Sequence, residues 1–241
     1  SGTVNTMSGG SQYISRGGTV TVSTMSDGMQ TIAGGMGTVS MMSSGTQYIM
    51  HGGQGTVTTM EDGEQTIADG GTGTVNTMNS GYQIIISGSG TVSALNGGTQ
   101  IVSSGGTSQD TSLNSGGKVH LYKDGVVTNI TYGGGTLLLD GVDAGYDNMQ
   151  LGQGAGDSNV IMALQSGATM TSTTINSGGA QHVLNSGTTT STTVNSDGYL
   201  AISSGGSAID TTINSGGAQH VLNSGTATNT TVNSDGYMAI S

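Results

Sequence analysis

The stretch Thr173–Ser203 reads TTINSGGAQHVLNSGTTTSTTVNSDGYLAIS, and it returns almost unchanged as Thr211–Ser241. The two copies differ at three pairs of positions: Thr189/Ala227, Ser191/Asn229 and Leu200/Met238. Each copy halves again, because Asn-Ser-Gly-Gly or Asn-Ser-Asp-Gly recurs at equal intervals, at Asn176, Asn195, Asn214 and Asn233. A self-similar period of this length indicates a stacked repeat architecture with a unit of about 19 residues.

A looser copy of the same unit fills the N-terminal half. Gly-Thr-Val opens six units at nearly regular spacings, at Gly2, Gly18, Gly37, Gly55, Gly73 and Gly90. A turn follows each opening, and then a second short segment in which Gln is followed two residues later by Ile or Val, as in Thr46–Ile49. β-Branched residues and frequent Gly disfavour helix. Each unit is therefore predicted to hold two short strands, with the Gly residues serving the turns between them.

A two-stranded unit cannot bury its own apolar face, so the units must stack, each strand pairing in parallel with its equivalent in the next unit. The sequence predicts an all-β fold, a parallel β-solenoid (β-helix) of about twelve rungs, where a rung is one turn of the solenoid. Along one continuous rod we expect a loose-repeat solenoid at 1–125, irregular rungs with an acidic Gly-rich loop at 126–166, and a strict repeat of the unit at 167–241. Val142–Gly156 fits no register, and a rung made of two units is an open alternative.

Stacking places equivalent side chains above one another, which predicts columns inside the solenoid. The first is a ladder of amides that donate and accept along the solenoid axis: Gln12, Gln30, Gln47, Gln65, Gln83, Gln100, Gln181 and Gln219, with Leu200 and Met238 replacing Gln. Two residues further on, and so on the same inward face, lies a core column: Ile14, Ile32, Ile49, Ile67, Ile85, Val102, Val183, Ile202, Val221 and Ile240. A third column precedes the turn: Met7, Met25, Met42, Met60, Met78, Leu95, Leu113, Ile175, Val194, Ile213 and Val232. The turn residues Asn176, Asn195, Asn214 and Asn233 are expected to form a further ladder.

The composition excludes several classes of protein. The 241 residues include 46 Gly but no Pro and no Cys, which rules out disulfide scaffolds and thiolate metal sites. Three basic residues, Arg16, Lys118 and Lys123, stand against fourteen acidic ones, giving a net charge of −11. So negative a chain would not neutralise a phosphate backbone or an anionic membrane surface. We therefore expect no nucleic-acid partner and no direct membrane insertion of this segment.

Candidate catalytic and metal-binding residues are sparse, and no enzyme is predicted. The carboxylates Glu61, Asp62, Glu64 and Asp69 fall on one rung at or beside turns, while the basic residues are scattered. His51, His120, His182 and His220 are too far apart for a local metal motif, and His182 and His220 should stack two rungs apart on an outward face. The acidic segment offers oxygen ligands in Asp140, Asp143, Asp147 and Asp157, which makes Ca²⁺ the one candidate cofactor.

The unit Thr-Thr-Ile-Asn-Ser-Gly-Gly-Ala-Gln-His-Val-Leu-Asn-Ser-Gly, at Thr173–Gly187 and Thr211–Gly225, closely resembles the repeat of the AIDA-type self-associating autotransporter adhesins. The match is close in the second half of the chain, looser in the first, and fails across Val142–Gly156. The resemblance implies a secreted β-helical passenger on the surface of a diderm bacterium. It also implies roles in host-cell attachment, aggregation and biofilm formation, and Ser or Thr residues that an O-glycosyltransferase modifies in some members.

The sequence thus predicts a non-enzymatic, extracellular adhesin, either anchored to the outer membrane as a passenger or secreted. Its polar faces of outward Thr, Ser, Asn and Asp would bind other copies of the chain, and host-cell receptors or glycans are further expected partners. Two alternatives stay open. A glycan-binding or glycan-cleaving β-helix would use Tyr13, Tyr48, Tyr199 and Tyr237, the notable aromatic residues. A subunit of an end-to-end extracellular filament would explain why both chain ends stop in register with the repeat.

Overall fold

The computed structural model describes residues 1–142, 149–152 and 160–241, which contain strands and turns but no helix. These residues form about 13 turns of about 18 residues each. Strands pair in parallel with their equivalents one turn later, as β1 (Gly2–Ser15) does with β2 (Thr19–Ala33). The predicted parallel β-solenoid is confirmed, with a unit close to the expected length, and the alternative rung of two units is wrong. The chain divides into two compact units, Ser1–Thr131 and Tyr132–Ser241.

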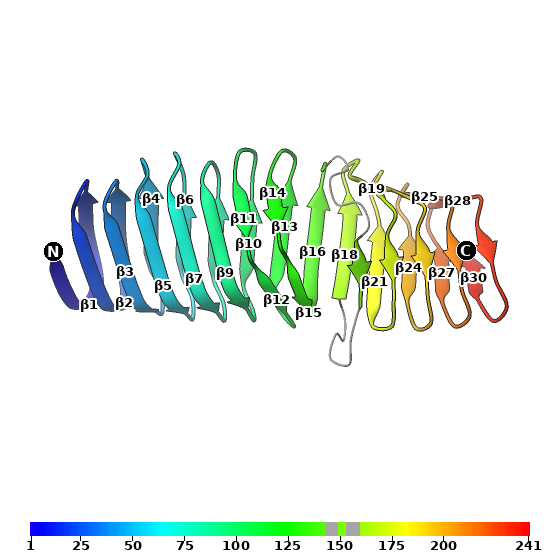
Figure 1. Ribbon diagram of the computed structural model, residues 1–241, viewed down its shortest axis with the longest axis horizontal. Helices are drawn as coiled ribbons and strands as arrows, with labels where there is room; N and C mark the ends of the chain where they lie inside the picture. The colour runs from blue at the N-terminus through cyan, green and yellow to red at the C-terminus, as the bar shows by residue number, and fades with distance from the viewer. Residues whose placement is uncertain (143–148, 153–159) are drawn as a thin grey trace. The chain divides into compact units, whose positions relative to one another are not determined.

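The first unit begins with two long strands, its next turns hold two strands each with Gly-containing turns between them, and from Thr107 onward its strands become shorter (Figure 1). β1 and β2 run through a whole turn without a break, because bulges rather than tight turns bend them. The later strands are β3 (Met36–Met42), β4 (Thr46–Met50), β5 (Gln54–Met60), β6 (Glu64–Ile67), β7 (Thr72–Met78), β8 (Tyr82–Ile85), β9 (Ser89–Leu95), β10 (Thr99–Val102), β11 (Thr107–Gln109), β12 (Ser112–Asn114), β13 (Lys118–Tyr122) and β14 (Val126–Thr128). β15 (Thr131–Gly133) begins at the last residue of this unit.

The second unit has three short strands in each strict turn, where the sequence predicted two. Its strands are β16 (Gly135–Asp140), β17 (Gln150–Leu151), β18 (Val160–Gln165), β19 (Thr169–Thr171), β20 (Thr174–Ile175), β21 (Gly179–Val183), β22 (Thr188–Thr190), β23 (Thr193–Val194), β24 (Tyr199–Ile202), β25 (Ser207–Ile209), β26 (Thr212–Ile213), β27 (Ala218–Val221), β28 (Thr226–Thr228), β29 (Thr231–Val232) and β30 (Tyr237–Ile240). The extra corner arises because Ser191 and Asp210 take left-handed backbone conformations with φ of 56° and 57°. A left-handed residue turns the chain sharply and splits one strand into two.

Part of the segment Val142–Gly156 follows the repeat after all. Residues Gln150 and Leu151 pair in parallel with Thr174 and Ile175, and Leu151 is fully buried. The expectation that this segment fits no register is therefore wrong at β17. The remaining residues of the irregular segment, 143–148 and 153–159, lie outside the described residues.

The core contains the predicted Ile/Val and Met columns and one more. The Ile/Val column is buried from Ile14 to Val221 and the Met column from Met7 to Ile213, whereas Ile240 and Val232 are 74% and 44% exposed. The additional column, not predicted from the sequence, contains the Val of four Gly-Thr-Val units and Val22, which follows Val20-Thr21 and pairs with Val39: Val22, Val39, Val57, Val75 and Val92. Its signal was present in the sequence, since this Val recurs with the same period as the Ile and Met columns.

The Gly of the Gly-Thr-Val unit lies in a strand, so the expectation that Gly serves only the turns is wrong. Gly55 and Gly73 are the second residues of β5 and β7, and both are buried. A Cβ atom on Gly73 would lie 2.7 Å from Gln65 Oε1, and one on Gly55 would lie 2.6 Å from Gln47 Oε1. These glycines leave room for the amide column across the interior.

Candidate functional site

The Gln residues of the first unit form a continuous chain of hydrogen bonds along the interior. In each bond the Nε2 group of one Gln donates to Oε1 of the Gln one turn earlier, at 2.7 or 2.8 Å. The series is Gln12, Gln30, Gln47, Gln65, Gln83 and Gln100. It ends where Gln100 Oε1 accepts from the hydroxyls of Ser108 and Thr111 at 2.9 and 3.2 Å. Each buried amide is thus paired, which removes the cost of burying it.

The described residues of the second unit contain no such chain of amides, because Leu200 lies between Gln181 and Gln219 in the paired strands. Gln181 is bonded to hydroxyls instead. Its Nε2 donates to Thr173 Oγ1 at 3.4 Å, and Thr189 Oγ1 donates to its Oε1 at 3.4 Å. Hydroxyls of Thr therefore line the interior of this unit, and the expectation that Thr faces outward is wrong for the buried Thr173 and Thr189.

The four predicted turn Asn residues form an amide ladder at one corner of the second unit. Their side chains bond in sequence, each Nδ2 donating to the previous Oδ1 at 2.8 Å: Asn176, Asn195, Asn214 and Asn233. An equivalent ladder in the first unit was missed. There Asn114 donates to Asn96 at 2.8 Å and Asn96 donates to Asn79 at 3.1 Å. The Asn spacing of 17 and 18 residues was the available signal.

Columns of half-buried Thr cover the outer face of the long strands in the first unit. Thr38, Thr56, Thr74 and Thr91 lie in register on β3, β5, β7 and β9. A similar column on the second unit consists of Thr174, Thr193, Thr212 and Thr231. Each column presents uncharged hydroxyl groups at the regular spacing of neighbouring parallel strands, about 4.8 Å.

Aromatic and imidazole rings gather on the outer face of β21, β24, β27 and β30. The ring centroids of His182 and Tyr199 lie 6.1 Å apart, those of Tyr199 and His220 5.2 Å, and those of His220 and Tyr237 5.5 Å. The two histidines thus occupy one outward column as expected, with Ala201 between them, and Tyr199 and Tyr237 lie in the neighbouring column. Burial lowers the pKa of the His182 imidazole, because desolvation disfavours the protonated form.

The four candidate carboxylates of the first unit each contact a different neighbouring group. Asn79 Nδ2 donates to Glu61 Oε1 at 2.9 Å, Gly63 N donates to Asp62 Oδ1 at 2.8 Å, and Thr66 Oγ1 donates to Glu64. Asp69 lies 3.8 Å from His51 Nε2. These contacts spread the carboxylates over separate partners, so the four do not converge on one point where a substrate could be activated.

The proposed calcium ligands are only partly within the described residues. Asp140 is half-buried at the end of β16, and its Oδ2 accepts from Gln165 Nε2 at 3.1 Å. Asp143, Asp147 and Asp157 lie outside the described residues. Within the described part of the chain, no group of three or more His, Asp or Glu side chains is placed to hold a metal ion. Calcium binding therefore stays a prediction.

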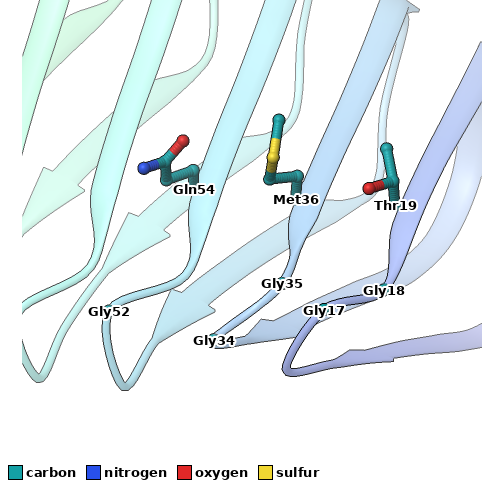
Figure 2. A pocket seen from close by; sticks show the side chains of 8 residues that line it. All are labelled: Gly17, Gly18, Thr19, Gly34, Gly35, Met36, Gly52 and Gln54. Carbon is teal, nitrogen blue, oxygen red and sulfur yellow. The ribbon is translucent and has the colours of Figure 1, made fainter.

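A shallow pocket on the first unit lies where the chain turns into the long strands. Figure 2 shows its glycine floor below three side chains, and the lining residues are Gly17, Gly18, Thr19, Gly34, Gly35, Met36, Gly52 and Gln54. The recess follows from chain length. Three residues separate Ile32 from Met36, whereas four separate Ile14 from Thr19 in the turn before. None of the lining side chains is titratable, so the pocket offers contact surface and hydrogen bonds rather than acid–base chemistry.

Three comparisons relate this architecture to known proteins. Residues 195–236 match the AIDA family model, described as "Adhesin of bacterial autotransporter system, probable stalk". The crystal structure of a TibC-catalyzed hyper-glycosylated TibA fragment (residues 55–350) is 30% identical, with a TM-score of 0.72, over 100% of this chain and 97% of that one. The chain belongs to the AIDA-type autotransporter adhesin family. No curated protein sequence matches it.

Membership in the AIDA-type adhesins gives the role of the chain. The chain is a surface adhesin β-solenoid, and an autotransporter adhesin acts outside the cell, at its surface. These matches favour neither a glycan-binding or glycan-cleaving β-helix nor a filament subunit. Within the described residues, no helix has the length and apolar character needed to cross a membrane.

Proposed function

We propose that this AIDA-type adhesin is non-enzymatic and joins bacterial cells by binding further copies of itself through its outer Thr columns. The observation that carries the proposal is the register of Thr38, Thr56, Thr74 and Thr91 on paired strands of the first unit. A facing copy with the same spacing can make one weak hydrogen-bonded contact at every rung. The contacts then act together, because after the first is made the others are effectively intramolecular.

Charge sets the conditions under which this association occurs. The net charge is −11 at pH 7, so two copies repel one another at low ionic strength. Added salt screens the repulsion, and acidification toward the pI near 4.1 removes it. Multi-angle light scattering should therefore show a molar mass that rises with salt and with falling pH. A mass that stays monomeric over this whole range would contradict the proposal.

A matched pair of variants separates the Thr face from net charge. Thr56→Asp with Thr74→Asp places two carboxylates on the proposed contact face, whereas Ser80→Asp with Ser104→Asp places them on exposed turns. Both variants carry the same net charge. Association should weaken strongly in the first and only slightly in the second. Equal weakening would mean that charge alone, and not the Thr face, governs association.

We also propose that outward Ser and Thr hydroxyls accept sugars from an O-glycosyltransferase, as a passenger held at the outer membrane. The support is the neighbouring TibA fragment, which is hyper-glycosylated through TibC, together with the many half-buried and exposed hydroxyls described above. Intact mass spectrometry of the protein from its native host should give a mass above the 23.7 kDa of the sequence. A mass equal to that of the sequence would refute modification.

A further inference from the structure

The two copies of the long repeat, Thr173–Ser203 and Thr211–Ser241, place the same buried amide in two different surroundings. Gln181 and Gln219 are both fully buried and occupy equivalent positions. The Gln181 amide is satisfied: Thr189 Oγ1 donates to Oε1, and Nε2 donates to Thr173 Oγ1 and lies 3.6 Å from Met170 Sδ. The Thr189 hydroxyl also lies 2.8 Å from that of Thr192. One hydroxyl therefore links the Gln181 amide to the next turn.

The surroundings of Gln219 lack that link. The strand pairing places Ala208 at the position of Met170 and Ala227 at the position of Thr189. Within the described residues, four buried polar atoms have no hydrogen-bond partner: Thr211 Oγ1, Gln219 Nε2, Gln219 Oε1 and Thr230 Oγ1. Thr211 and Thr230 are the equivalents of Thr173 and Thr192. All four atoms thus belong to the network that the Thr189 hydroxyl completes in the other copy.

The two alanines also change the space beside the amide. Relative to the surroundings of Gln181, they remove Cγ, Sδ and Cε of a methionine and Oγ1 and Cγ2 of a threonine. The strands keep the same pairing register in both copies. A buried water molecule requires both room and two to four polar partners. The four unpaired atoms beside Gln219 supply the polar partners, and the side-chain atoms that the two alanines lack would supply the room.

We propose that Gln219, Thr211 and Thr230 bind a buried water molecule that takes the place of the Thr189 hydroxyl. Water can donate two hydrogen bonds and accept two, so it can donate to Gln219 Oε1 and Thr211 Oγ1 while accepting from Gln219 Nε2 and the Thr230 hydroxyl. This satisfies all four unpaired atoms. The site is independent of the adhesive function proposed above, and it makes solvent a structural component of the solenoid interior.

The test uses nuclear magnetic resonance of the ¹⁵N-labelled chain, with Gln181 as an internal control. Cross-relaxation between water and the Gln219 side-chain NH₂ protons should have the sign of a long-lived bound water. The Gln181 NH₂ protons should show no such signal. Hydrogen exchange between water and neighbouring Thr hydroxyls would add a signal at both amides. The test therefore rests on the difference in water cross-relaxation between Gln219 and Gln181. No bound-water signal at Gln219, or equal signals at both amides, would overturn the proposal.

Two exchange variants provide a second test, because each is expected to change the bound-water signal at one of the two amides. Ala208→Met with Ala227→Thr transplants the surroundings of Gln181 onto Gln219 and should abolish the bound-water signal there. Met170→Ala with Thr189→Ala performs the reverse exchange and should create the signal at Gln181. A folded first variant that keeps the signal would refute the site. Should that variant fail to fold, the wild-type comparison and the reverse variant still decide the question.

Discussion

Replacing Leu200 with Gln should leave the stability of the protein almost unchanged, although Leu200 is fully buried. The paired strands place residue 200 directly between Gln181 and Gln219. In the first unit, consecutive Gln residues in this arrangement bond at 2.7 to 2.8 Å. The substitution would therefore join two separate amides into a continuous ladder.

The magnitude follows from three terms. Losing the buried apolar surface of Leu costs about 2 kcal/mol. Two new ladder hydrogen bonds return about 1 kcal/mol each. The terms nearly cancel, so we expect the free energy of unfolding to stay within about 1 kcal/mol of the wild type.

The control is Ile202→Gln on the same strand. Ile202 is also fully buried, but its neighbours in the paired strands are Val183 and Val221, which offer no amide partner. Its replacement should cost about 4 kcal/mol, from about 2 of lost apolar burial and about 2 of an unsatisfied amide. Urea unfolding followed by circular dichroism measures both variants. If Leu200→Gln destabilises the chain as much as Ile202→Gln, the reasoning about in-register amides is wrong.

Three further outcomes are expected. Gly73→Ala should destabilise the chain by about 1–3 kcal/mol through overpacking against Gln65, whereas Thr74→Ala on the outer face should change stability by less than about 0.5 kcal/mol, both measured by urea unfolding. Because burial lowers the pKa of His182 in the folded state, its contribution is complete above the unfolded pKa of 6.5 and is lost as pH falls below it. Urea midpoints between pH 8 and 5 should accordingly fall less for His182→Gln than for the wild type, and parallel curves would contradict this. Calcium binding at the acidic segment around Asp140 predicts heat and a raised melting temperature on titration of the chelated protein, and the absence of both would exclude it.

The interior columns could be predicted from the sequence because stacking converts a position in the repeat into a position on the rung. Gln47 and Gln65 recur with the same period as Ile49 and Ile67, so parallel in-register pairing is enough to place all four on the inward face. No side-chain contact across the interior had to be known. The same logic would have found the Val57 column, which shares the period.

The polar interior of the second unit could not be predicted in this way. Period-two counting assumes an unbroken strand, but Ser191 has φ of 56° and turns the chain between Thr190 and Thr192. On either side of that corner the alternation of inward and outward residues restarts, so Thr189 and Thr192 both face inward at a spacing of three. Nothing in a run of Thr and Ser residues marks which one takes the left-handed conformation. The irregular spacing of inward Thr residues was therefore invisible before the fold was known.

The polar interior also explains how a chain with so few large apolar residues can present a regular adhesive face. Apolar columns alone tolerate a shift in strand register, because a contact between Ile and Val stabilises the fold nearly as much as a contact between two Ile side chains. An amide ladder does not, since a shift by one residue would leave each Gln amide facing an outward position and unpaired. The ladder thus fixes the register of the turns from Gln12 to Gln100, and the outer Thr column on those turns has the same register. Adhesive strength should then grow with the number of stacked turns, because each turn adds one correctly spaced contact.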